Sequence, residues 1–233
     1  MLIKADNAVI LAAGYARRFA PLSDRCPKGL FTVKGEVLIE RQIRQLLSAG
    51  IPQIIVVTGY KSPMFSYLSE KYGVLLVENP AYRERNNHSS IYAAREYLAN
   101  SYICSCDNYF TKNVFTAAVD RPYYSAVYSP GETEEYCLET DEDQRITHVS
   151  IGGRDSWYML GHVFWDARFS QEFLRILERE YPLPQTKDLL WEQIYMRHLD
   201  RLCLHMKAYP PGIILEFDSV DELERFEPHY KIL

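Results

Sequence analysis

The sequence predicts one α/β domain built around a mixed sheet, and three observations lead to this fold class. An apolar run over residues 9–13 ends at a glycine, and two arginines follow, which is typical of a buried first strand that opens into a loop. Strand and helix patterns then alternate as far as residue 77. From residue 123, short segments of alternating polarity take over. We therefore expect parallel strands and then an antiparallel extension of the sheet.

The first half of the chain is expected to follow the order βαβαβ. Residues 39–47 have apolar side chains at helical spacing, and Gly50 ends that helix. The β-branched residues of 53–58 predict a second buried strand. A helix over 64–72 and a strand over 74–77 follow. This order implies parallel strands with right-handed crossovers, and such sheets bind ligands at the carboxyl ends of their strands.

The remaining elements extend this sheet and cover it. A helix over 89–98 and a strand over 102–108 complete the first half. Pro-Gly, Asp-Glu-Asp and Gly-Gly turns then separate four predicted antiparallel strands, at 124–129, 135–140, 146–151 and 158–165. The last predicted elements are amphipathic helices at 170–180 and 187–199, strands at 203–208 and 213–217, and a helix at 220–226, for which Ser219 or Asp218 is the expected N-cap.

The composition excludes several classes of function. The 233 residues are 47% hydrophobic and 24% charged, so the chain can bury a sizeable core. A net charge of −5 gives no broad basic field, which argues against nucleic acid as a partner. The apolar runs are shorter than the ~20 residues of a membrane span, and no signal peptide pattern opens the chain. We therefore expect a cytoplasmic protein without membrane insertion. The five cysteines are odd in number and lack metal-ligand spacing, so they favour neither a disulfide framework nor a zinc site.

The loop after the first strand has the features of a phosphate site. Ala12, Ala13 and Gly14 lack bulk, so backbone N–H groups can approach a triphosphate closely, and the glycine can adopt a positive φ. Arg18 and Lys28 supply positive charge, and the proline before the lysine stiffens the chain there. The alternative interpretation is an ordinary strand and turn with solvated basic residues.

Two acids each follow a predicted strand, and we expect both strands to end at the same edge of one sheet. Asp107 and Asp218 can there hold one Mg²⁺, with phosphate oxygens and water as the other ligands. Asp-Asn after a strand is also common turn chemistry. A second polar stretch, residues 86–90, precedes a predicted helix. Asn87 or Ser89 can cap this helix, whose N-terminus can also bind an anion or a nucleotide.

Several of these residues form a known motif. The pattern Leu11-Ala12-Ala13-Gly14-x-x-x-Arg18, with Pro27-Lys28, resembles the signature of the sugar-phosphate and choline-phosphate nucleotidyltransferases. That family usually has a second glycine where this chain has Ala16, so we expect a stiffer or shifted loop. Further matches over nearly the whole chain resemble the bacterial CTP:phosphocholine cytidylyltransferases, among them Asn86-Asn87, Asp107-Asn108-Tyr109, Phe164-Trp165-Asp166 and Asp218-Ser219-Val220.

This resemblance implies a Rossmann-like nucleotidyltransferase fold over residues 1–233, with a nucleotide-binding half over about 1–120 and an acceptor-binding half over about 121–233. It also implies that phosphocholine attacks the α-phosphorus of CTP, giving CDP-choline and pyrophosphate. Since the attacking phosphate is already anionic, no general base is needed.

The resemblance also assigns roles to residues. Arg18 and Lys28 neutralise the β- and γ-phosphates, while Asp107 and Asp218 hold Mg²⁺ at the α-phosphate. The residues expected to contact the nucleotide are Leu11, Ala12, Ala13, Gly14, Arg18, Lys28, Asn86, Ser89 and Ser90.

The acceptor is expected to bind in the second half of the chain. Because aromatic faces and carboxylates hold a quaternary ammonium, the candidates are Tyr136, Tyr158, Trp191, Asp188, Glu192 and Glu216. With 13% aromatic residues, most aromatic side chains must belong to the core. The phosphocholine enzymes carry Trp and Tyr as cage residues where this chain has Tyr136 and Leu190. A smaller head group, as in 2-aminoethylphosphonate or phosphoethanolamine, is therefore an alternative, and the acids would hydrogen-bond its primary ammonium.

Two other functions fit the same pattern. One is a sugar-1-phosphate nucleotidyltransferase, which differs only in the acceptor half. The other is a nucleotide-binding regulatory module without catalysis, against which the joint presence of Arg18, Lys28, Asp107 and Asp218 argues. The sequence does not predict the oligomeric state. The start at residues 1–7 is compatible with a native terminus or with a longer chain that carries a kinase or aminotransferase domain.

Overall fold

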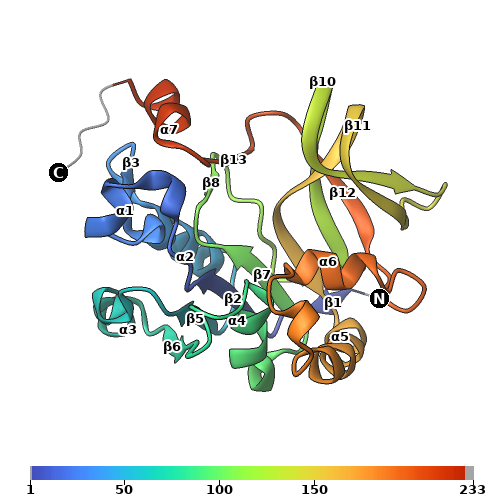
Figure 1. The fold of residues 1–233 in the computed structure, drawn as a ribbon, viewed down its shortest axis with the longest axis horizontal. Coiled ribbons are helices and arrows are strands. Elements are labelled where there is room, and N and C mark those ends of the chain that lie inside the picture. Colours follow the sequence, from blue (N-terminus) through green and yellow to red (C-terminus); the bar gives the residue numbers. More distant parts are fainter. Residues whose placement is uncertain (1, 229–233) are drawn as a thin grey trace.

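A seven-stranded mixed sheet forms the centre of the protein (Figure 1). The structure is a computed structural model that describes residues 2–228, so residue 1 and residues 229–233 of the predicted domain lie outside the described part. In spatial order the strands are β12 (His205–Tyr209), β10 (Tyr123–Thr140), β11 (Ile146–Trp165), β7 (Ser101–Ser105), β2 (Asn7–Ala12), β5 (Ile54–Thr58) and β6 (Leu75–Glu78).

The first half of the chain forms the parallel part of this sheet, as predicted. β2 runs parallel to both β5 and β7, and β5 runs parallel to β6. Val9 and Ile10 of β2 are both fully buried, and they pack on opposite faces of the sheet. A strand that is covered on both faces needs a continuous apolar run, which explains the run that the sequence shows there.

Helices cover both faces of the sheet (Figure 1). On one face, Ile43 of α2 (Leu38–Ser48) and Leu68 of α3 (Tyr67–Tyr72) pack against Ile10 and its neighbours. The helices on the other face are α4 (His88–Ala93), α5 (Ala167–Glu180) and α6 (Trp191–Met196). In the part of the chain that the structure describes, no helix has the length and apolar character needed to cross a membrane.

The extension of the sheet differs from the prediction in two ways. The four short strands are two long ones, β10 and β11, which pair antiparallel and turn only at the Asp-Glu-Asp segment. Gly131 and Gly152 have φ of 83° and 79°, so the backbone bends at bulges inside these strands instead of reversing. In addition, β12 pairs with β10 in parallel, so the extension is not wholly antiparallel. The overall class, an α/β fold with a mixed sheet, is confirmed.

One expectation about topology is wrong. β13 (Ile214–Glu216) pairs with β8 (Asn108–Phe110) in a separate two-stranded sheet, so Asp218 does not follow a strand of the central sheet. The acid nevertheless returns to the carboxyl ends of the parallel strands, because β8 begins one residue after Asp107.

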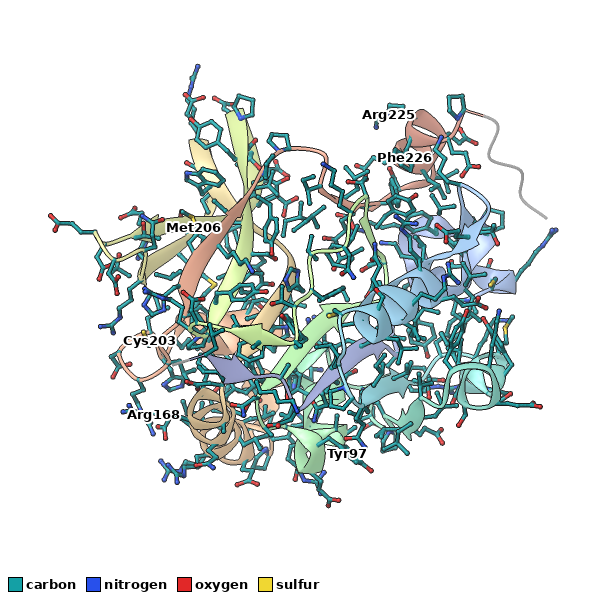
Figure 2. All side chains as sticks on the ribbon, turned by 180° about the vertical axis from the view of Figure 1, so that it is seen from behind. Tyr97, Arg168, Cys203, Met206, Arg225 and Phe226 are labelled. Atoms are coloured by element: carbon teal, nitrogen blue, oxygen red, sulfur yellow. The ribbon has the colours of Figure 1, made fainter. Side chains whose placement is uncertain are left out.

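A small cap lies beside the central sheet. Phe19, Leu22 of α1 (Leu22–Arg25) and Leu223 of α7 (Val220–Phe226) share a separate apolar cluster. The Ser219 hydroxyl accepts a hydrogen bond from the backbone N–H of Glu222 at 3.3 Å and so caps α7, as the sequence predicts. From behind, Figure 2 shows Arg225 and Phe226 of α7 on the opposite side of the molecule from Met206 of β12.

The remaining elements are short. The predicted helix over 187–199 is shorter in the structure, where only α6 forms within this range, and a 3-10 turn at residues 184–186 precedes it. The other small elements are strands β1 (Ile3–Lys4), β9 (Ala118–Val119), β3 (Thr32–Val33) and β4 (Glu36–Val37), and 3-10 helices η1 (Arg17–Phe19), η2 (Lys28–Leu30), η3 (Ser62–Phe65), η4 (Arg95–Tyr97) and η5 (Pro184–Thr186).

Candidate active site

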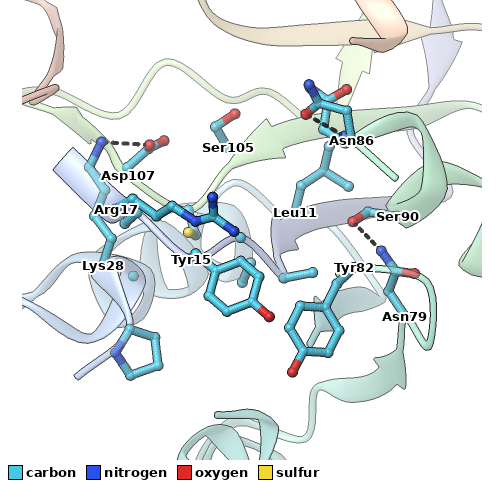
Figure 3. Close-up of a pocket in the computed structure, with 18 of the residues that line it drawn as sticks. Leu11, Tyr15, Arg17, Lys28, Asn79, Tyr82, Asn86, Ser90, Ser105 and Asp107 are labelled. Atoms are coloured by element: carbon cyan, nitrogen blue, oxygen red, sulfur yellow. Dashed lines mark hydrogen bonds and ion pairs between the residues drawn. The ribbon is translucent and has the colours of Figure 1, made fainter. Parts of the chain in front are cut away.

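A cavity of about 730 Å³ opens at the carboxyl ends of β2, β6 and β7. Its walls come mainly from the loop after β2, the turn that holds Lys28, the segment 79–90 and the turn after β7, and Asp188, Glu216 and Asp218 complete the lining. Figure 3 shows side chains from all four segments facing one space. The cavity thus lies where a parallel sheet presents its ligands.

The loop after β2 contains a residue with a positive φ, as expected, but this residue is Ala16 and not Gly14. Gly14 does not have a positive φ, and a Cβ atom placed there would meet nothing within 4 Å. Ala16 instead adopts the left-handed conformation, with φ 50° and ψ 47°. This conformation costs an alanine roughly 1–2 kcal/mol. Gly14 therefore leaves the wall open towards the cavity, and Ala16 makes the turn.

Two basic side chains and two carboxylates gather at one end of the cavity. The Nζ atom of Lys28 lies 2.8 Å from Oδ2 of Asp107 and 3.9 Å from Oδ1 of Asp218. Arg18 donates to the same Oδ1 atom of Asp218 at 2.9 Å. The lysine is buried, with 9% of its side chain exposed, whereas the arginine is 73% exposed. The structure therefore brings together four residues that lie up to 200 positions apart in sequence.

The electrostatics of this cluster follow from its excess of acids. Burial alone would lower the pKa of Lys28, but the carboxylates of Asp107, Glu216 and Asp218 outweigh it and raise the pKa. Loss of hydration and the negative charges of Asp107 and Asp218 raise the pKa of Glu216 to about 8, although the positive charge of Lys28 lowers it. The Glu216 side chain is open to the cavity, so water screens part of this effect. The lysine stays charged and is suited to binding phosphate.

The two aspartates are suited to a hard cation that also binds phosphate. Across residues 2–228, Oδ1 of Asp107 is a buried acceptor without a hydrogen-bond partner. No three His, Cys, Asp or Glu side chains within this range form a cluster that could hold a metal ion by themselves. Mg²⁺ commonly binds one or two carboxylates and takes its other ligands from substrate phosphates and water. The residues present therefore fit Mg²⁺ bound together with a phosphate compound.

The opposite end of the cavity holds polar and aromatic side chains. The Nδ2 atom of Asn79, a buried residue, donates to the hydroxyls of Ser89 and Ser90 at 2.8 and 3.1 Å. The rings of Tyr15 and Tyr82 lie 5.4 Å apart and form a wall (Figure 3). This part of the cavity can accept a flat, polar ring, since it offers both an aromatic surface and hydrogen-bonding groups.

Three of these residues are not among those predicted from the sequence. Asn79 directly follows the third strand, and the rule that ligands bind at strand carboxyl ends points to it. Tyr15 and Tyr82 gave no such signal among 18 tyrosines. The contact that places Tyr82 is tertiary: a Cβ atom at Gly59 would lie 2.8 Å from the Tyr82 ring, so only glycine admits the ring there.

Asn86 and Asn87 connect the cavity to the segment before α6. The Nδ2 atom of Asn86 donates to the backbone carbonyl of Asp188 at 3.0 Å. Asn87 accepts from the backbone N–H of Trp191 at 2.7 Å and donates to Glu192 at 3.2 Å. Asn87 occupies the N-cap position of α4 but makes no side-chain capping bond, because Trp191 and Glu192 engage its side chain. Ser89 lies inside α4, where its hydroxyl donates to the Asn86 carbonyl and accepts from Asn79, so the expected side-chain cap is wrong.

The acceptor candidates lie in different surroundings. Glu216 and the highly exposed Asp188 line the cavity. Glu192 accepts a hydrogen bond from the Tyr124 hydroxyl at 3.4 Å. The pKa of Tyr136 is raised mainly by the burial of its own side chain and to a smaller extent by the negative charge of Glu192. Tyr158 is half-buried. This burial is the main cause of its raised pKa, and the negative charges of Glu135 and Glu216 add to the shift. Trp191 is only 3% exposed; it stacks on Tyr124 and meets Trp165 edge-on inside the core.

Comparisons with known proteins give a consistent result. A family model described as MobA-like NTP transferase domain matches residues 8–179. The chain is 34% identical to the choline-phosphate cytidylyltransferase of Streptococcus pneumoniae over 221 residues, which are 95% of this chain and 96% of that protein. It is 35% identical to the 2-aminoethylphosphonate cytidylyltransferase of Lancefieldella rimae over 231 residues, which are 97% of this chain and 94% of that protein.

A solved structure agrees with these relatives. The fold matches that of the CTP:phosphocholine cytidylyltransferase from Streptococcus pneumoniae with a TM-score of 0.92. The two chains are 34% identical, and the match covers 98% of this chain and 100% of the other.

Proposed function

Since the chain belongs to the MobA-like NTP transferase family, we propose that it transfers the cytidylyl group of CTP to phosphocholine, giving CDP-choline and pyrophosphate. The observation that carries this proposal is the meeting of Lys28, Arg18, Asp107 and Asp218 beside the open loop at Gly14. Positive charge and carboxylates at one end of a cavity suit the transfer of a phosphoryl group that carries a nucleoside.

In the proposed reaction, a phosphate oxygen of the acceptor attacks the α-phosphorus of CTP. The new P–O bond forms as the bond between the α-phosphorus and the bridging oxygen breaks, and pyrophosphate takes the electron pair. Backbone N–H groups of Ala12, Ala13 and Gly14 hold the triphosphate, while Lys28 and Arg18 neutralise the leaving pyrophosphate. Asp107 and Asp218 would hold Mg²⁺, which when bound offsets negative charge on the phosphate oxygens.

We assign the nucleoside to the end of the cavity opposite the charged cluster. Leu11, Asn86, Ser89 and Ser90 all line it, and Asn79 fixes the two serines there. We assign about residues 1–120 to nucleotide binding and about residues 121–233 to acceptor binding, with Asp218 of the second half reaching the metal. The proposal also places the enzyme in the cytoplasm, because its donor is a nucleoside triphosphate.

The experiment that tests this function is pyrophosphate release from CTP and Mg²⁺ with four acceptors, namely phosphocholine, phosphoethanolamine, 2-aminoethylphosphonate and glucose-1-phosphate. We expect the highest kcat/KM with phosphocholine and no release after EDTA removes the metal. A preference for glucose-1-phosphate would contradict the acceptor assignment. The absence of pyrophosphate release with all four acceptors would contradict the proposed reaction and favour a nucleotide-binding regulatory module.

A primary-amine acceptor is the second candidate. The 2-aminoethylphosphonate enzyme of Lancefieldella rimae is as similar to this chain as the choline-phosphate enzyme of Streptococcus pneumoniae. Two of the three candidate acids, Asp188 and Glu216, line the cavity, and Glu192 contacts the cavity residue Asn87. Trp191, in contrast, is buried in the core, and position 190 is a leucine. Carboxylates can accept hydrogen bonds from a primary ammonium, which a quaternary ammonium cannot donate.

The pH dependence of acceptor use tests the role of Glu192. Burial raises the pKa of Glu192 to about 7, although hydrogen bonds from Asn87 and Tyr124 oppose this shift. Below that pH the carboxyl is neutral, and above it the carboxylate attracts the acceptor's ammonium. We expect kcat/KM for the acceptor to rise as the pH increases through about 7.

Glu192→Gln is the matched variant for this measurement. It should lose the part of the rise that Glu192 causes and keep the part that comes from the acceptor phosphate, whose second pKa is about 6. Identical pH profiles for wild type and variant would exclude Glu192 from acceptor binding.

A further inference from the structure

Gln42 of α2 holds the turn that carries Asp107. Its side-chain Nε2 donates to the backbone carbonyl of Ser105 at 2.7 Å and to that of Asn108 at 2.8 Å. These two carbonyls stand on either side of Asp107, one at the end of β7 and the other at the start of β8. One side-chain amide therefore hydrogen-bonds to the backbone on both sides of Asp107.

The orientation of this amide is determined by its partners. Both partners are carbonyl oxygens, which only accept hydrogen bonds, so the NH₂ group must face them and the oxygen must face away. Gln42 is fully buried. Among the residues that the structure describes, its Oε1 atom has no hydrogen-bond partner.

The surroundings of Gln42 set it apart from an ordinary helix residue. The neighbouring inward positions of α2 are the apolar Ile39, Ile43 and Leu46, which pack against the sheet. Burying an amide with an unpartnered oxygen among them is unfavourable compared with burying another aliphatic side chain. The packing of α2 on the sheet does not require a glutamine at this position.

Other contacts hold the same turn from its remaining sides. The backbone N–H of Cys106 donates to the carbonyl of Leu11 at 3.2 Å, which ties the turn to the end of β2. A Cβ atom at Gly29 would lie 3.0 Å from the Cys106 side chain, so the segment after Lys28 also packs against the turn. The turn is thus fixed relative to both Lys28 and the loop after β2, and Gln42 provides its contact with α2.

We propose that Gln42 is a positioning residue, which orients the Asp107 carboxylate for metal and substrate through the two carbonyls that flank it. This inference rests on the proposed function, in which Asp107 is a metal ligand. Gln42 does not line the cavity and acts only through the turn. Removing its donors would let the turn relax, and a small misplacement of a reacting or charge-stabilising group can cost a large factor in rate.

The test variant is Gln42→Met, which keeps the length, volume and helix preference of the side chain but has no donor. We expect kcat at saturating Mg²⁺ to fall about 10- to 100-fold, and the KM for CTP to rise by no more than about tenfold, because the metal binds together with the nucleotide phosphates. Mn²⁺ binding in the presence of CTP, followed by electron paramagnetic resonance of the free ion, should weaken by about tenfold.

Gln45→Met is the matched control. Gln45 lies one turn along on the same helix, and its Nε2 atom donates at 3.1 Å to the carbonyl of Phe110, at the far end of β8 from Asp107. We expect its kcat and Mn²⁺ affinity to stay within about twofold of wild type. Equal losses in the two variants, or a wild-type kcat in Gln42→Met, would overturn the proposal. If Gln42→Met does not fold, Gln42→Leu replaces it, with thermal unfolding measured for each protein.

This experiment separates the positioning role from the proposed function. Wild-type pyrophosphate release tests the function alone. If wild type forms no product with any acceptor, the reaction is wrong, and Mn²⁺ binding by Gln42→Met and Gln45→Met still decides whether Gln42 positions Asp107. If wild type is active and both variants bind Mn²⁺ as wild type does, the reaction stands and the role of Gln42 fails.

Discussion

Asp107→Asn is expected to lower kcat about a thousandfold while the protein remains folded, since charge stabilisation by a bound metal supplies several kcal/mol. The amide preserves the shape of the side chain but removes the negative charge that attracts the cation. It also leaves Lys28 without its 2.8 Å carboxylate partner. Raising the Mg²⁺ concentration should recover part of the activity, because the loss lies in metal binding.

The measurement is kcat for pyrophosphate release across a Mg²⁺ titration, together with thermal unfolding. Asp200→Asn, an exposed aspartate far along the chain, serves as the control and should behave as wild type. If Asp107→Asn kept near-wild-type turnover, Asp107 would not be a metal ligand. Asp218→Asn is expected to act in the same direction, because Asp218 belongs to the same cluster.

Lys28→Met should lower kcat by roughly 10²–10³-fold, the range found when a preorganised donor to developing negative charge is removed. The lysine is buried, carries a raised pKa and lies at the end of the cavity where pyrophosphate would leave. Methionine fills the same space without the charge. Because the variant leaves the Asp107 carboxylate without its cation, we also expect a modest loss of stability, of about 1–3 kcal/mol.

Steady-state kinetics with CTP and chemical denaturation check these two effects separately. Lys112→Met, at an exposed position outside the cavity, is the control and should change neither quantity. A Lys28→Met enzyme with normal kcat and only a raised KM would show that Lys28 binds the ground state and does not stabilise the leaving group. Arg18, which is 73% exposed, should give a smaller effect than Lys28 when replaced.

Much of the fold was accessible from local patterns. The run at Val9 and Ile10 predicts a strand that is buried on both faces, and it lies in the middle of the parallel part of the sheet. Ser219 caps the last helix where the sequence places a cap. The extension was harder to predict, since a glycine with a positive φ marks either a reversal or a bulge. At Gly131 and Gly152 only the pairing partners decide between them.

The candidate site divides in the same way. The small residues after β2, and the acids after β7 and β13, were found because their chemistry and their place at strand ends are both visible in sequence. Trp191 illustrates the opposite case: its type suits a cation cage, but it packs between Tyr124 and Trp165. Burial of an aromatic side chain depends on which elements cover it, and the residue type does not reveal this.

Local periodicity and residue chemistry predict the order of the elements in the parallel half, the open loop at Gly14 and the set of charged residues. Tertiary packing is needed to bring Asp218, which follows a strand outside the central sheet, to Lys28 and Asp107. It alone placed Tyr82 against Gly59, and the amide of Gln42 behind the Asp107 turn. Such contacts join segments far apart in the chain, and their geometry depends on the packing of the whole fold.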